Sequence, residues 1–287
     1  MIDEKQIRIA PRAPKTRASV GLALSGGGAR GLAHIGVLKV IEQAGIQVDC
    51  VAGSSMGGII AAAYAAGWTP RALEQEAINM RSVRQLVSLV DPLPPRRGLL
   101  AGNRVRAYLA RLLGDDLEFS DLQLPLALKA VDLHRGHQVC LRQGKVLDAV
   151  MATSAFPGVF APVEIDGTTL VDGGVLDNLP VEMPREMGAD VVIAVDVAPP
   201  LDDADAPPEW SLLPGPAKEM YQVAMIMNNA MTGVHLKEAP PDVLISPDLP
   251  RGIGIFSGFT QADRIISAGE EAARRTLPAL KQALAAS

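Results

Sequence analysis

The segment at residues 51–58, V-A-G-S-S-M-G-G, constrains the fold of this 287-residue chain more than any other. An apolar, β-prone run at 48–52 leads into it, and an alanine-rich run at 59–66 follows. This order predicts a strand, a sharp turn and a helix, which is the setting in which the pattern G-x-S-x-G presents a serine at the end of a strand. Any site built on this turn is therefore expected to centre on Ser55.

The glycine spacing indicates which serine the turn presents. A strand and a helix joined by so sharp a turn pass close together, so the residues two places either side of the central one must be nearly free of side chain. Gly53 and Gly57 meet this requirement around Ser55. Ser54 does not, because Met56 stands at one of its flanking positions. Ser55 is the candidate nucleophile, and the simpler alternative is a glycine-rich turn that carries a surface serine.

Charge and hydropathy exclude several classes of protein. The net charge of −5 argues against broad binding of nucleic acid. No run approaches the ~18 uncharged apolar residues of a membrane span, and the start M-I-D-E-K does not resemble a secretory signal. We therefore expect a cytoplasmic protein, which leaves work at the inner membrane face open. Cys50 and Cys140 lie in apolar runs and are expected to be buried core residues in a reducing compartment.

The order of the predicted elements indicates an α/β protein. A short apolar strand is expected at 19–24, then a glycine-rich loop, a helix at 32–44, and the strand, turn and helix around Ser55. This βαβα order favours a parallel sheet with helices on both faces. We expect one domain over 19–287, preceded at 1–18 by a basic arm without fixed structure.

Two later segments differ from this pattern. Residues 81–111 carry seven arginines against one acid, interleaved with Leu and Val, as in a cap-like segment that meets phosphate-bearing amphiphiles. The alternative is a pair of solvated helices whose arginines pair with acids elsewhere. Residues 198–217, rich in Pro, Asp and Ala, are predicted to form an exposed loop. Met227 and Met231 then belong to a stripe at helical spacing, which fills a core in most proteins and in the alternative forms a flexible wall for acyl chains.

A serine nucleophile needs a base, and histidine is the usual partner. His34 falls in the helix after the glycine loop, where core packing is expected. His134 and His137 flank a predicted hairpin turn and are expected at the surface. Only His235 comes late enough for the chain order serine, acid, histidine of an α/β-hydrolase, and no Gly or Pro loop presents it.

Asp172 is the stronger candidate for the base. It ends an apolar strand and precedes Gly173 and Gly174, which let the backbone turn tightly beside another group. A carboxylate is a weak base in water, but it can take a proton from Ser55 if it lies within hydrogen-bond reach in a site that desolvates it. Asp-Gly alone commonly marks a turn, so the inference depends on the motifs that accompany it.

The glycine-rich loop after the first predicted strand is suited to binding an anion. The successive N–H groups of Gly26, Gly27 and Gly28 can converge on the oxyanion of a tetrahedral intermediate. Removal of one such donor typically raises the barrier by ~3 kcal/mol.

Dinucleotide binding is the competing interpretation of the same loop. Gly26, Gly28 and Gly31 satisfy G-x-G-x-x-G after a strand, and an acid, Asp49, follows about 20 residues later, as that fingerprint requires. Three points count against it. Asp49 precedes the apolar part of its strand instead of ending it, Arg30 places a charge inside the loop, and the sharp turn occupies the place of the ribose.

Five runs of the chain match one known family in order and in spacing. They are G-G-G-A-R-G at 26–31, G-L-A-H-I-G-V-L at 31–38, G-S-S-M-G at 53–57, T-S-A-F-P-G-V-F-A-P-V at 153–163 and D-G-G-V-L-D-N-L-P-V at 172–181. Together they resemble the patatin-like phospholipase family, densely over 20–197 and more thinly to about residue 275. The resemblance is closest to short bacterial members, which are similar to the catalytic domain of neuropathy target esterase.

The resemblance implies a three-layer α/β/α fold with a mainly parallel central sheet. It implies a dyad without histidine, in which Ser55 is the nucleophile and Asp172 the base, and an oxyanion hole formed by the amides of Gly26, Gly27 and Gly28. Asn178 is expected in a structural turn. The residues expected to support the site are Arg30, Gly31, Gly53, Met56, Gly57, Gly173 and Gly174.

The activity implied by the resemblance is hydrolysis of fatty acyl esters of phospholipids or lysophospholipids through an acyl-serine. No metal, nucleotide or other cofactor is implied, nucleic acid is not an expected partner, and the oligomeric state is left open. Peripheral contact with a membrane surface is compatible with this activity. Two alternatives remain: a soluble carboxylesterase acting on short acyl esters, and a non-enzymatic partner-binding protein on the same scaffold.

Overall fold

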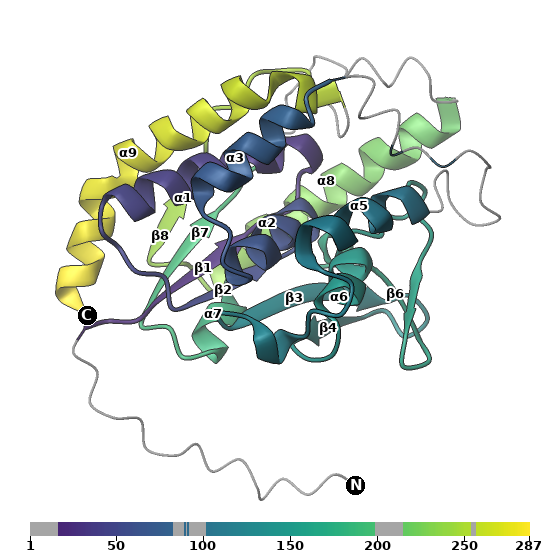
Figure 1. Cartoon of the computed structure of the whole chain (residues 1–287), viewed down its shortest axis with the longest axis horizontal. Helices are drawn as coiled ribbons and strands as arrows, with labels where there is room; N and C mark the ends of the chain where they lie inside the picture. Colours follow the sequence, from purple (N-terminus) through teal and green to yellow (C-terminus); the bar gives the residue numbers. More distant parts are fainter. Residues whose placement is uncertain (1–16, 83–88, 90, 92–101, 199–214, 254–256) are drawn as a thin grey trace, which may run out of the picture.

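The computed structural model describes residues 17–82, 89, 91, 102–198, 215–253 and 257–287. Its centre is an eight-stranded sheet in the order β5-β6-β3-β2-β1-β7-β8, with β4 paired to β3 (Figure 1). Neighbouring strands are parallel among β1 (Val20–Leu24), β2 (Cys50–Gly53), β3 (Leu126–Asp132), β7 (Val191–Val195) and β8 (Val243–Ile245). Antiparallel pairs add β4 (His137–Leu141), β5 (Val163–Ile165) and β6 (Thr168–Asp172). The predicted α/β class with a mainly parallel sheet is confirmed.

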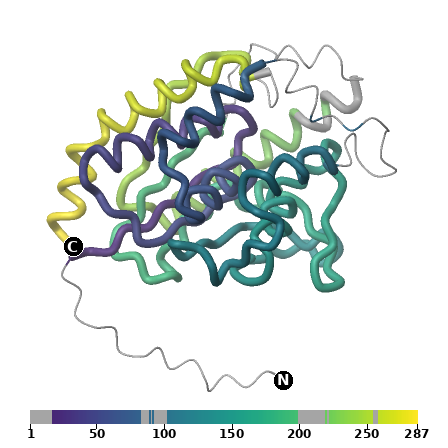
Figure 2. Tube along the Cα trace, in the orientation of Figure 1, coloured from purple at the N-terminus to yellow at the C-terminus, as the bar shows by residue number. Residues whose placement is uncertain are grey.

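Helices cover both faces of this sheet, and their paths are followed in Figures 1 and 2. The α-helices are α1 (Ala33–Gln43), α2 (Ser55–Ala65), α3 (Pro70–Asn79), α5 (Asn103–Leu113), α6 (Val146–Thr153), α7 (Glu182–Glu186), α8 (Gly215–Glu238) and α9 (Ala262–Ala286). Short 3-10 helices are η1 (Gly28–Leu32), η2 (Phe119–Asp121), η3 (Gly173–Val175) and η5 (Ser257–Gln261).

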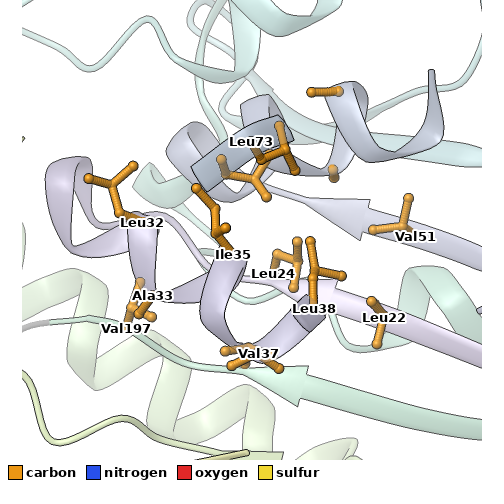
Figure 3. Packing of buried hydrophobic residues seen from close by; sticks show 14 of the residues in the cluster. Leu22, Leu24, Leu32, Ala33, Ile35, Val37, Leu38, Val51, Leu73 and Val197 are labelled. Atoms are coloured by element: carbon orange, nitrogen blue, oxygen red, sulfur yellow. The ribbon is translucent and has the colours of Figure 1, made fainter. Parts of the chain in front are cut away.

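The alternation of side chains along the central strands produces the layers. In β1, Leu22 and Leu24 pack in the large core shared with α1, where Leu38 lies beside them (Figure 3). The residue between them, Ala23, faces the opposite side and packs near Leu236 of α8. Because successive side chains of a strand point to opposite faces, the large residues meet α1 and its neighbours while the small ones admit α7 and α8. This arrangement gives the expected three-layer fold.

Helices α1 and α9 cross at unusually close range on the first of these faces. A Cβ on Gly36 of α1 would overlap the Ile266 carbonyl oxygen, and a Cβ on Gly269 of α9 would overlap that of Ala33. The two glycines therefore let the helix backbones touch. Figure 1 shows α9, α1 and α3 side by side over the sheet.

Some local expectations are confirmed and others are wrong. A hairpin with Asp166 and Gly167 in its turn joins β5 to β6, and both residues have positive φ, 50° and 75°. Cys50 is buried as expected, but Cys140 is exposed, because it shares an uncovered face of β4 with Gln138. The methionine stripe does not fill a core throughout: Met227 and Met231 of α8 are exposed.

Several predicted segments lie wholly or partly outside the described residues. These are the basic arm, of which Arg17 and Ala18 are described, the loop at 198–217, described at residue 198 and from 215, and the middle of the arginine-rich segment. Two described arginines of that segment pair with acids: Arg81 with Asp263 at 2.9 Å and Arg106 with Asp148 at 2.7 Å. These pairs favour the alternative in which its arginines meet acids elsewhere. No helix of the described chain has the length and apolar character needed to cross a bilayer.

Candidate active site

Ser55 occupies the sharp turn between β2 and α2. Its φ of 52° lies in the left-handed region, a conformation that costs a non-glycine residue about 1–3 kcal/mol and recurs at functional turns. A Cβ on Gly53 would lie 2.6 Å from the Gly57 carbonyl oxygen, and one on Gly57 would overlap the carbonyl of Leu24 in β1. Both glycines of G-x-S-x-G are therefore required by the close approach of β2, α2 and β1.

Strand register brings Asp172 to the level of this turn. Between β2 and β3, Gly53 lies opposite Leu128, and between β3 and β6, Ala130 lies opposite Asp172. The β3 partner of Asp172 is thus two residues further along β3 than the partner of Gly53. Ser55 is also two residues beyond Gly53, so it reaches the same level as Asp172. Although the two residues are far apart in the sequence, they line the same pocket.

The Asp172 carboxylate is almost completely buried. One oxygen, Oδ1, accepts a hydrogen bond of 2.8 Å from the Gly174 N–H. Burial raises the pKa of Asp172 to about 6, against the opposing effects of this N–H and of the nearby hydroxyls of Ser55 and Ser54. The other oxygen, Oδ2, has no well-aligned hydrogen bond among the described residues; such bonds in active sites often tighten only with substrate. The environment makes this carboxylate a stronger base than one in water.

The three N–H groups of the glycine loop differ in their hydrogen bonding. The Gly26 N–H donates to the Asn178 carbonyl oxygen at 3.2 Å, and Asn178 Nδ2 donates back to the Gly26 carbonyl oxygen at 3.2 Å. The prediction that Gly26 is an oxyanion donor is thereby corrected, because its amide is occupied. Within the described part of the chain, the N–H groups of Gly27 and Gly28 have no backbone acceptor, and both residues line the pocket.

The other predicted site residues lie around these groups. Arg30 is buried, and its Nε donates to the Val197 carbonyl oxygen at 2.8 Å, so it ties the glycine loop to the segment after β7. Met56 and Gly174 line the pocket, and Gly31 lies against the Met56 side chain. Gly173 lies against the backbone of β3.

A pocket of about 500 Å³ opens at Ser55 and is mostly apolar. Its size is within the range of small-molecule sites. α1, α2, α3, α5 and α8 all contribute to its wall, among them through Ile35, Ile59, Leu73, Leu109 and Met225. Ser55 and Asp172 thus line a mostly apolar cavity of a size suited to a hydrocarbon chain.

None of the four histidines lies in the wall of this pocket. His34 is fully buried beneath the glycine loop, where its Nε2 lies 2.8 Å from the Ser25 carbonyl oxygen and burial lowers its pKa to about 4. His235 lies 3.4 Å from Asp177, which also pairs with the buried Lys129 at 2.9 Å. His134 and His137 are exposed. The geometry gives no support to a triad through His235.

The sequence did not predict the contacts of three residues near the site, Thr153, Asn228 and Lys129. The Thr153 hydroxyl accepts a hydrogen bond from the Ser55 N–H, and Asn228 Nδ2 of α8 donates to the Gly174 carbonyl oxygen at 2.7 Å. Thr153 begins the run T-S-A-F-P-G, whose family match was the available signal. No sequence motif marks Asn228, which lies in the middle of a helix. Lys129 is a single charged residue within an apolar strand.

The position of Asp49 also argues against the dinucleotide interpretation, which requires an acid near the glycine loop. Asp49 precedes β2 at the opposite end from Ser55, where its carboxylate accepts from the Val20 N–H and pairs with Arg17 at 2.8 Å. Among the described residues, no group of three or more His, Cys, Asp and Glu could hold a metal ion.

Comparison with known proteins shows which family the chain resembles. The family model "Patatin-like phospholipase" matches residues 22–185, more than half of the chain. An uncharacterized NTE family protein of Mycobacterium bovis is 36% identical over 206 residues, covering 68% of this chain and 56% of that protein. Lysophospholipase nte1 of Aspergillus fumigatus is 34% identical over 181 residues, covering 62% of this chain and 12% of its own length.

Among solved structures, VipD from Legionella pneumophila matches with a TM-score of 0.52 and 15% identity, covering 93% of this chain and 67% of that one. This likeness concerns the fold alone. The chain spans about half the length of the mycobacterial relative and a small part of the fungal one. With the family model matched across the glycine loop, the turn and the D-G-G segment, the chain belongs to the patatin-like phospholipase family.

Proposed function

We propose that the protein is a serine acyl-ester hydrolase that uses Ser55 and Asp172 as a dyad. The observation that carries this proposal is a serine on a strained turn beside a buried carboxylate whose pKa is raised to about 6. Ser55 Oγ attacks the ester carbonyl carbon while Asp172 takes its proton. The N–H groups of Gly27 and Gly28 hold the oxyanion, the alcohol leaves with the proton, and water repeats the sequence on the acyl-serine.

The proposed substrates are fatty acyl esters of phospholipids or lysophospholipids. The apolar pocket next to Ser55 supports a long acyl chain, because burying each CH₂ contributes about 0.8 kcal/mol. The printed name of the fungal relative, a lysophospholipase, points the same way. A soluble carboxylesterase that prefers short esters would leave most of this cavity unused.

Contact with a membrane surface forms part of the same proposal. Val223, Ile226, Met227, Met231 and Val234 of α8 are exposed apolar residues at helical spacing on one face. The same helix contributes Met225, Asn228 and Asn229 to the pocket. A lipid surface against this face would hold the protein at the membrane, with the pocket on the other side of α8.

The first test is intact-mass spectrometry after treatment with a fluorophosphonate. We expect one adduct on the wild type, none on Ser55→Ala, and labelling slowed by about 10²–10⁴-fold in Asp172→Asn. Hydrolysis of lysophospholipid micelles should exceed that of short dispersed esters. Preference for the short esters would favour the soluble carboxylesterase. A folded wild type that forms no adduct and cleaves no ester would refute the proposal in favour of a binding protein.

A further inference from the structure

One short segment of the chain holds the backbone amides of both dyad residues. The Ser55 N–H donates to Thr153 Oγ1 at 3.1 Å, and the Asp172 N–H donates to the Ala155 carbonyl oxygen at 3.0 Å. Thr153 is the last residue of α6, and Ala155 follows two residues later. The end of α6 is therefore the point at which the nucleophile turn and the base strand are joined.

The hydroxyl of Thr153 has a fixed orientation. Its hydrogen is given to the Lys129 carbonyl oxygen at 2.5 Å, so a lone pair of Oγ1 is left to accept from Ser55. Lys129 precedes Ala130, the residue that lies opposite Asp172 between β3 and β6. One hydroxyl thus links the Ser55 amide to the strand that sets the height of Asp172. Thr153 is fully buried, so water does not replace these bonds.

We propose that Thr153 is a positioning residue for the reaction, through the bond between its hydroxyl and the Ser55 amide. This inference rests on the proposed function. Ser55 must be held at positive φ, and an N–H bonded to a buried acceptor opposes rotation back to the common region. Without the acceptor, the serine backbone relaxes and Oγ moves away from Asp172. Small errors in such placement can reduce rates about 10²-fold.

The methyl group of Thr153 is a separate contribution. It packs near Gly58 in the first turn of α2, so a change at this position could disturb packing as well as hydrogen bonding. Two variants separate the effects. Thr153→Val keeps the branched shape and removes the hydroxyl, whereas Thr153→Ser keeps the hydroxyl and removes the methyl group.

The experiment measures the second-order rate of fluorophosphonate labelling, and kcat and KM for a lysophospholipid, each per folded molecule. We expect Thr153→Val to lose about 10- to 100-fold in labelling rate and in kcat with little change in KM. Thr153→Ser should retain most of the rate. Thr169→Val is the matched control, because the hydroxyl of this buried threonine of β6 bonds the Glu164 side chain and no other group among the described residues.

The outcomes are distinct. Labelling of Thr153→Val at the wild-type rate overturns the inference and leaves the proposed function intact. Equal losses in the Val and Ser variants would assign the effect to packing and also overturn it. A wild type that is never labelled refutes both proposals together. If Thr153→Val does not fold, Thr153→Ala removes the same hydroxyl, and its rate is compared with that of Thr153→Ser.

Discussion

The pKa of Asp172 depends on a balance between burial and a small number of donors. Loss of water raises it to about 6, while the Gly174 N–H and two serine hydroxyls limit the rise. A base is active when deprotonated, so kcat/KM should rise tenfold per pH unit below about 6 and level off above it. The carboxylate is thus ionised at neutral pH while remaining basic enough to accept a proton.

The same burial implies a cost in stability that can be measured in Asp172→Asn. The pKa of Asp172 in the folded state, about 6, exceeds the ordinary value of 3.8. Ionisation therefore lowers the free energy of unfolding as the pH rises between these two values, by about 3 kcal/mol at most. The variant should therefore unfold at a temperature several degrees higher than the wild type at pH 8 and at a similar one at pH 4, while losing activity. Calorimetry at both pH values checks this. A variant less stable than the wild type at pH 8 would contradict it.

Individual residues show how far the sequence predicts the site. The positions of Ser55 and Asp172 were predictable, because tight turns and close approaches leave glycines on both sides of Ser55 and directly after Asp172. The occupied amide of Gly26 was not, because its acceptor, the Asn178 carbonyl, comes from a segment whose position depends on the folded sheet. The contact of Thr153 with Ser55 was hidden for the same reason.

At the scale of elements, the crossing of α1 and α9 is the feature most sensitive to added volume. Gly269→Ala would place a Cβ against the Ala33 carbonyl oxygen, and such overpacking typically costs about 1–3 kcal/mol. We expect a lower unfolding temperature. The control is Gly233→Ala in α8, where nothing lies within 4 Å of the added Cβ; it should stabilise the helix by about 0.5–1 kcal/mol. Equal thermal unfolding of the two variants would show that the helices can separate without cost.

Elements also show which patterns carry information. Apolar runs predicted β1 and β2, the strands that precede the glycine loop and Ser55. They did not distinguish a central strand from β4, because an apolar run has the same appearance whether or not a neighbour covers it, and Cys140 is exposed as a result. The helical spacing of apolar residues in α8 likewise did not indicate which face of the helix packs against the core.

At the scale of the whole molecule, α8 has two surfaces of interest. It carries an exposed apolar face, and other residues of the same helix line the pocket. Met227, at 60% exposure, is the most exposed large apolar residue of that face. Met227→Glu should weaken binding to phospholipid vesicles by about tenfold through loss of apolar burial, and leave cleavage of a dispersed short ester unchanged. Vesicle co-sedimentation measures the first, and a chromogenic ester the second.

The control for this variant lies on the edge strand β8. Leu244→Glu changes another exposed apolar residue, 41% accessible, on β8. It should bind vesicles as the wild type does. If both variants bind equally well, α8 is not the lipid-facing surface.

The pairing of β1 with β7 sets the order in which this molecule acquires reactivity. The loop after β1 is shaped by the chain after β7, since the Ser25 hydroxyl accepts from the Val197 N–H across 172 positions of sequence. During synthesis the turn with Ser55 emerges first, the strand with Asp172 much later, and the support of the glycine loop later still. If Ser55 acts as proposed, a nascent or truncated chain carries an unreactive serine, and activity arises only when the last central strands have joined the sheet.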